Sequence, residues 1–135
     1  MRKHSSWIAM LASGPLMAVV LASPVSAHHG WSDYQDTQFE ITGTLETPVS
    51  LAGPHATATI RVNGVVWDVV LAPSPRTARA GLTEDVIPVG DTVTASGHRH
   101  NDPATLEIKT ERLTWNGIVF NVYPDREGCL VRRRP

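Results

Sequence analysis

The chain has 135 residues, of which 41% are hydrophobic and 19% are charged. Removal of a predicted signal peptide over residues 1–27 leaves 108 residues, enough for one small domain with a single modest core. Loss of Arg2 and Lys3 leaves ten basic side chains against thirteen acidic ones, a net charge of about −3 with neutral histidine. That balance excludes a strongly basic protein and argues against nucleic acid or an anionic membrane as the partner.

Three features of the N-terminal sequence predict export. A basic start at residues 2–4 precedes an apolar stretch over 7–22, and small residues end at Ala27, which is the order of a secretory signal peptide. Residues 13–15 (Ser-Gly-Pro) interrupt the apolar stretch, whereas a retained membrane anchor, the alternative, needs roughly 20 predominantly apolar residues. We therefore expect a cleaved signal peptide over 1–27 and a periplasmic or secreted protein with no stable membrane span after processing.

Apolar and polar residues alternate with a period of two over much of the remaining chain, as in β-strands. The first such segment, residues 39–46, contains Gly43, which indicates a bulge or a bend that lets one strand serve two sheets. Residues 55–62 and 65–71 flank an Asn-Gly pair, the strongest short hairpin signal, because both residues tolerate a positive φ.

One short helix is predicted after the third strand. Ser74 is placed to cap it, Pro75 to occupy its first position and Gly81 to end it. Residues 92–97 then predict a fourth strand, and residues 98–103 have the composition of a loop.

The last predicted strands cover residues 105–115 and 118–122, with a second Asn-Gly turn between them. In the first of these, the apolar residues are expected to switch from one side of the strand to the other partway along.

These elements predict an all-β domain with one short helix over residues 28–122. The favoured architecture is a small OB-like β-barrel, because a single helix between the third and fourth strands is common in such folds, and a β-sandwich is the alternative. Residues 123–135 are predicted to form a flexible basic tail that contains the only cysteine, Cys129, and the arginines Arg132, Arg133 and Arg134.

Cleavage after Ala27 gives the mature chain the start His28-His29, and this pair suggests a metal site. The terminal amine and the imidazole of His28 supply two nitrogens in one chelate ring, and His29 or His55 supplies a third. Copper(II) favours such nitrogen ligands, and zinc is the alternative, with Asp33 or water as a fourth ligand. The competing interpretation is a polar terminus that binds no metal.

His98 and His100 alternate on an extended segment and are a less favoured second metal site, since they also fit a solvated polar surface. Trp31 and Tyr34 are expected to pack against the domain, and Trp67 and Trp115 within or at the ends of the core.

A binding or adaptor module without metal, for a peptide, glycan or small ligand, is the alternative function. No serine has the surroundings of a nucleophile, and no glycine-rich phosphate loop is present, so we predict that the protein is not an enzyme.

Several short motifs in combination resemble a family of small exported bacterial proteins that is classed as a domain of unknown function. The resemblance covers residues 27–122, and its motifs are residues 28–31 (His-His-Gly-Trp), 53–55 (Gly-Pro-His), Trp67, 72–74 (Ala-Pro-Ser), 79–82 (Arg-Ala-Gly-Leu) and 90–94 (Gly-Asp-Thr-Val-Thr). Members typically carry an Asn-Pro-His motif, in which Gly53 replaces the asparagine here. The resemblance implies an exported β-barrel-like domain and no established activity.

Overall fold

The computed structural model describes residues 30–129, except for the side chains of residues 127–129. The predicted signal peptide, His28, His29 and the three arginines near the C-terminus therefore lie outside the described residues. The elements in chain order are β1 (Tyr34–Ser50), β2 (His55–Val62), β3 (Val65–Pro73), α1 (Ser74–Arg79), β4 (Thr92–His100), β5 (Glu107–Trp115), β6 (Ile118–Asn121) and the 3₁₀ helix η1 (Pro124–Cys129).

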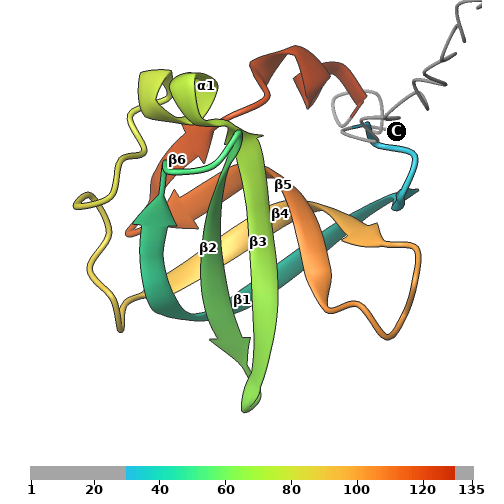
Figure 1. Ribbon diagram of the computed structural model, residues 1–135, viewed down its shortest axis with the longest axis horizontal. Coiled ribbons are helices and arrows are strands. Elements are labelled where there is room, and N and C mark those ends of the chain that lie inside the picture. Colours follow the sequence, from blue (N-terminus) through green and yellow to red (C-terminus); the bar gives the residue numbers. More distant parts are fainter. Residues whose placement is uncertain (1–29, 130–135) are drawn as a thin grey trace, which may run out of the picture.

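The six strands form one sheet in the order β3-β2-β1-β4-β5-β6, and a parallel pairing between β3 and β5 closes it into a ring. All other pairings are antiparallel. Figure 1 shows α1 beside one end of this ring, between β3 and β4 in chain order. The structure confirms the predicted all-β class with one short helix, and the ring resembles the OB-like arrangement.

β1 is shared between two parts of the sheet, as the glycine within it predicted. Thr44 is paired with both Arg61 of β2 and Thr92 of β4. Just before it, a Cβ atom on Gly43 would lie 2.4 Å from the carbonyl oxygen of Arg61. Glycine is therefore required because the backbone of β2 approaches too closely for any side chain.

The predicted turns are confirmed, whereas the predicted helix cap is wrong. Asn63 and Asn116 have φ angles of 49° and 48°, and each is followed by a glycine with positive φ, as a type I′ turn requires. Gly81, with φ of 87°, follows the end of α1. The cap residue of α1 is Pro73, and the hydroxyl of Ser74 instead donates a hydrogen bond to the carbonyl of Gly53 at 2.6 Å. Ser74 thus holds the loop before β2.

A bulge in β5 moves its apolar residues from one side of the strand to the other, as predicted. Ser96 pairs with Arg112 and the next residue of β4 pairs with Thr110, so that Glu111 is the extra residue. Ile108 and Leu113 consequently both belong to the core although they lie five positions apart. The loop predicted at residues 98–103 is wrong in its first three residues, because β4 continues to His100.

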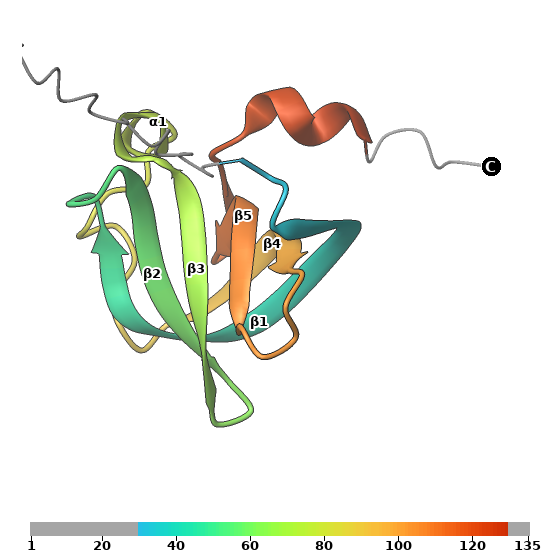
Figure 2. The ribbon, with the colours of Figure 1, turned by 45° about the vertical axis from the view of Figure 1, so that its right-hand side comes forward.

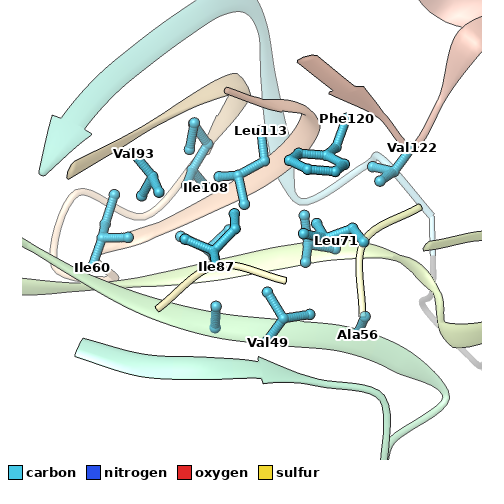
Figure 3. Packing of buried hydrophobic residues seen from close by; sticks show 14 of the residues in the cluster. Val49, Ala56, Ile60, Leu71, Ile87, Val93, Ile108, Leu113, Phe120 and Val122 are labelled. Atoms are coloured by element: carbon cyan, nitrogen blue, oxygen red, sulfur yellow. The ribbon is translucent and has the colours of Figure 1, made fainter. Parts of the chain in front are cut away.

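The core fills the ring with aliphatic side chains from β1 to β5 and with Phe120 from β6. Figure 3 shows Ile60, Leu71 and Leu113 converging from three different strands, together with Phe120 of β6. Tyr123 also belongs to the core, with 9% exposure, so the packed part of the chain extends beyond the expected boundary at residue 122.

Gly97 provides a test of the packing of β4 against β5. A Cβ atom there would lie 1.9 Å from the carbonyl oxygen of Lys109, a clash with backbone that no rotamer relieves. We expect Gly97→Ala to lower the free energy of unfolding by about 1–3 kcal/mol, measured by urea denaturation. Gly30→Ala, whose Cβ would meet only ordinary contacts at 3.8 Å, is the control and should change stability little. Equal stability of the two variants would contradict the proposed close approach.

Candidate functional site

His55 is the first residue of β2, and it is paired with Pro73, the residue that precedes α1. Its Nδ1 lies 2.9 Å from the carbonyl oxygen of Leu71, and a carbonyl only accepts, so Nδ1 carries a proton. In a neutral ring the lone pair then lies on Nε2. The backbone N–H of Ser74 donates to the carbonyl of Pro54 at 3.2 Å, which attaches the segment before His55 to the helix.

The N-terminal segment is attached to the domain by Trp31, as expected from the sequence. Its ring lies edge-on to those of His98 and Tyr123, with centroids 5.4 and 5.1 Å away, and the guanidinium carbon of Arg126 lies 3.7 Å from its centroid. In Figures 1 and 2 the first described residues, α1 and η1 all lie on the upper side of the ring. Trp31 thus joins the N-terminal segment to the η1 segment.

A buried carboxylate lies beneath this contact. Glu111 is 3% exposed, and its carboxylate forms an ion pair with Nε of Arg126 at 3.1 Å and accepts a hydrogen bond from the side-chain amide of Gln38 at 3.0 Å. His98 Nε2 is 3.1 Å from the same carboxylate, and His98 Nδ1 donates to the carbonyl of Gln35 at 2.7 Å. The buried charge is therefore compensated on several sides, as burial of an ionised group requires.

His98 and His100, the less favoured metal site expected from the sequence, have different surroundings in the structure. His98 is 8% exposed, with both ring nitrogens at hydrogen-bond distance from other groups, so it is not solvated surface. His100 Nδ1 accepts from the backbone of Asp102 at 3.1 Å, and its ring packs against Tyr34. Among the described side chains, no three of His, Cys, Asp or Glu are grouped to hold a metal ion.

A buried lysine, together with Gln38, His98 and Glu111, forms a group of polar residues that we call the polar cluster. Lys109 is 4% exposed, and its ammonium nitrogen lies 5.7 Å from the ring centroids of both Trp31 and Tyr34. Burial lowers the pKa of Lys109, and the negative charge of Glu107 opposes that change. No sequence pattern indicates this burial, because a charged residue in a period-two strand is expected to face solvent.

Trp67 and Trp115 pack as expected. Trp67 lies against Phe39 with ring centroids 5.6 Å apart, and the guanidinium carbon of Arg99 lies 5.1 Å from the Trp67 ring centroid. Trp115 donates from Nε1 to Asp91 at 2.8 Å.

An open groove of about 430 Å³ runs over the outer side of β1, β2 and β3, and neither Trp67 nor Trp115 lines it. Threonine and serine hydroxyls and two carboxylates, those of Asp68 and Glu107, contribute to its lining.

The two tyrosines, Tyr34 and Tyr123, test the burial of this region. Burial raises the pKa of both phenols, and for Tyr34 the hydrogen bond that it donates to Glu107 adds to the rise, whereas Arg76 and Arg126 partly oppose it at Tyr123. A free phenol is half ionised near pH 10. We expect the folded protein to show less than half of the tyrosinate absorbance of the unfolded protein at that pH. Equal absorbance would show that the phenols are solvated.

No helix among the described residues has the length and apolar character needed to cross a membrane.

The chain has distant similarity to several solved structures. Apo TiaS, a tRNAIle2 agmatidine synthetase, is 16% identical with a TM-score of 0.44, over 58% of this chain and 18% of that one. A chain of the S. pombe Stn1-Ten1 complex is 16% identical with a TM-score of 0.45, over 58% of this chain and 57% of that one. A tRNA fluorescent labeling enzyme gives a TM-score of 0.43 at 16% identity, over 58% of this chain and 17% of that one. The similarity thus spans less than two thirds of each of these chains.

No curated protein matches the chain. A family model does match, over residues 16–109, which include β1 to β4 and the start of β5. The chain therefore belongs to a family of unknown function, DUF6152.

Proposed function

We propose that the protein is exported and binds copper(II), or another divalent metal such as zinc, through His28, His29 and His55. The observation that carries this proposal is the hydrogen bond from His55 Nδ1 to the carbonyl of Leu71. Histidines that bind metals through one nitrogen typically donate the other N–H to a carbonyl or carboxylate, which fixes the tautomer and the orientation of the ring.

The attachment of the N-terminal segment supports convergence of the three histidines. Trp31 contacts Tyr123, and the guanidinium carbon of Arg76 lies 5.4 Å from the Tyr123 ring centroid. Arg76 belongs to α1, whose first residue binds the segment immediately before His55. His28 precedes Trp31 by three residues, a span of at most about 10 Å. A tether of this length would allow the histidine pair to approach the end of the ring at which His55 lies, which supports the proposal.

The chemistry of a mature terminus at His28 suits copper. The amine and imidazole of one residue form a chelate ring, and two further imidazoles complete a nitrogen-rich site. The amine has a reference pKa of roughly 7.7–8.0, so metal binding must displace a proton near neutral pH. Copper affinity should therefore increase with pH through this range.

The test uses secreted protein whose mass confirms that it begins at His28. This protein is titrated with copper(II), and binding is followed by electron paramagnetic resonance. We expect one nitrogen-rich site per chain. His55→Gln should weaken binding by at least about tenfold, the effect of losing about 1.4 kcal/mol. An additional alanine before His28 should also weaken it, because the terminal amine is then displaced from the chelate ring.

The matched control is His100→Gln, which removes an imidazole elsewhere on the domain and should leave copper affinity unchanged. Equal loss in the two histidine variants, or no saturable binding in any form, would contradict the proposed site. Circular dichroism of each variant separates loss of a ligand from loss of folding.

The groove favours a second candidate function, a binding module for an organic ligand. Hydroxyl groups of Thr57 and Thr59 and the carboxylates of Asp68 and Glu107 provide acceptors for a polyhydroxylated or cationic ligand. Nuclear magnetic resonance titration with a neutral trisaccharide and with spermidine distinguishes these chemistries. Saturable changes confined to β2 and β3, and weakened by Asp68→Asn for the cation, would favour this function, whereas unchanged spectra would exclude both ligands.

A further inference from the structure

A second hollow lies between the end of α1 and the segment that leads from β6 into η1. It has a volume of about 320 Å³, and it is lined by Arg76, Arg79, Ala80, Asn121 and Pro124. This cavity, here called the α1 pocket, shares no lining residue with the groove over β1, β2 and β3.

Two arginines line the α1 pocket. Arg76 and Arg79 are three residues apart on α1, a spacing that places both side chains on the same side of a helix. The guanidinium of Arg76 lies over the Tyr123 ring, which restricts the directions that it can take. The side chain of Arg79 forms no ion pair or hydrogen bond with another described residue.

The positive charge of the pocket is poorly compensated by the protein. The carboxylate of Asp125 lies 3.7 Å from Arg76, but its side chain is 82% exposed, and such a pair contributes little. The nearby Arg126 is paired with the buried Glu111, which is therefore already engaged. Two like charges beside one hollow repel each other, and a bound anion removes that repulsion.

We propose that the α1 pocket binds a small molecule through an oxyanion group, a phosphate or a carboxylate, held by Arg79 and Arg76. A guanidinium presents paired N–H donors that match two oxygens of either group. The volume exceeds that of an inorganic anion and is within the range of small-molecule sites, so the ligand carries further atoms beside the anionic group. The proposal does not depend on the metal site.

The test uses secreted protein freed of metal with a chelator, labelled for nuclear magnetic resonance and titrated with inorganic phosphate, and separately with acetate, at constant ionic strength. We expect saturable shifts of the amides of residues 78–81 and 121–123. Arg79→Gln should weaken phosphate binding by at least about tenfold, since it removes a charged donor. Because this side chain has no partner among the described residues, the variant is expected to fold.

Arg61→Gln is the matched control. Arg61 is a similarly exposed arginine, but it is paired with Glu46 at 2.6 Å on another part of the sheet. We expect its loss to leave the phosphate titration unchanged. Shifts that do not saturate, or the same affinity in both variants, would overturn the proposal. Stronger binding of phosphate than of acetate would assign the pocket to phosphorylated ligands, and the reverse order would assign it to carboxylates.

Discussion

The polar cluster and the attachment of both ends of the domain depend on the close backbone contact between β4 and β5 at Gly97. A side chain at this position would occupy the space of the Lys109 carbonyl, and the bulge follows directly after it in the pairing of the two strands. The bulge adds Glu111 without a partner in the ladder. The backbone carbonyl of Glu111 is then available to accept hydrogen bonds from Val122 and Tyr123, which fix the segment that leads to η1.

The side chain of Glu111 continues this attachment. Burial of a carboxylate costs several kcal/mol unless charged or hydrogen-bonded partners compensate it. Here the compensation comes from Gln38 of β1, His98 of β4 and Arg126 of η1, so that three separate parts of the chain must be in place together. Arg126 then stacks on Trp31. One buried charge thus couples the order of the N-terminal segment to that of the C-terminal segment, and loss of either exposes the carboxylate.

Local sequence signals were sufficient for most of the fold. The Asn-Gly turns, the alternation in each strand and Gly43 all act through backbone conformation or side-chain period within a few residues. The parallel pairing of β3 with β5 has no such signal, because it follows from closure of the whole sheet. The extension of β4 through His98 was not predicted, for a related reason. His98 is buried by residues distant in sequence, such as Trp31, and a polar segment considered without these contacts has the composition of a loop.

The same reasoning explains which parts of the candidate site were accessible from the sequence. His55 was identifiable because it begins a strand after a proline, although its tautomer required the carbonyl of Leu71, sixteen residues away. Lys109 and Glu111 were not identifiable, since only packing of Trp31 and Arg126 turns their side of β5 into an interior. The alternation of residues in a single sequence predicts which side of a strand faces the core. It does not predict that the opposite side is also buried, as it is in β5.

The charge around the α1 end of the ring relates the two proposed sites to each other. Arg76, Arg79 and Arg126 lie in this region, and their positive potential disfavours a divalent cation bound nearby. An anion in the α1 pocket would reduce that potential within a screening length of about 8 Å at physiological ionic strength. By linkage, an anion that strengthens metal binding is itself bound more tightly when the metal is present.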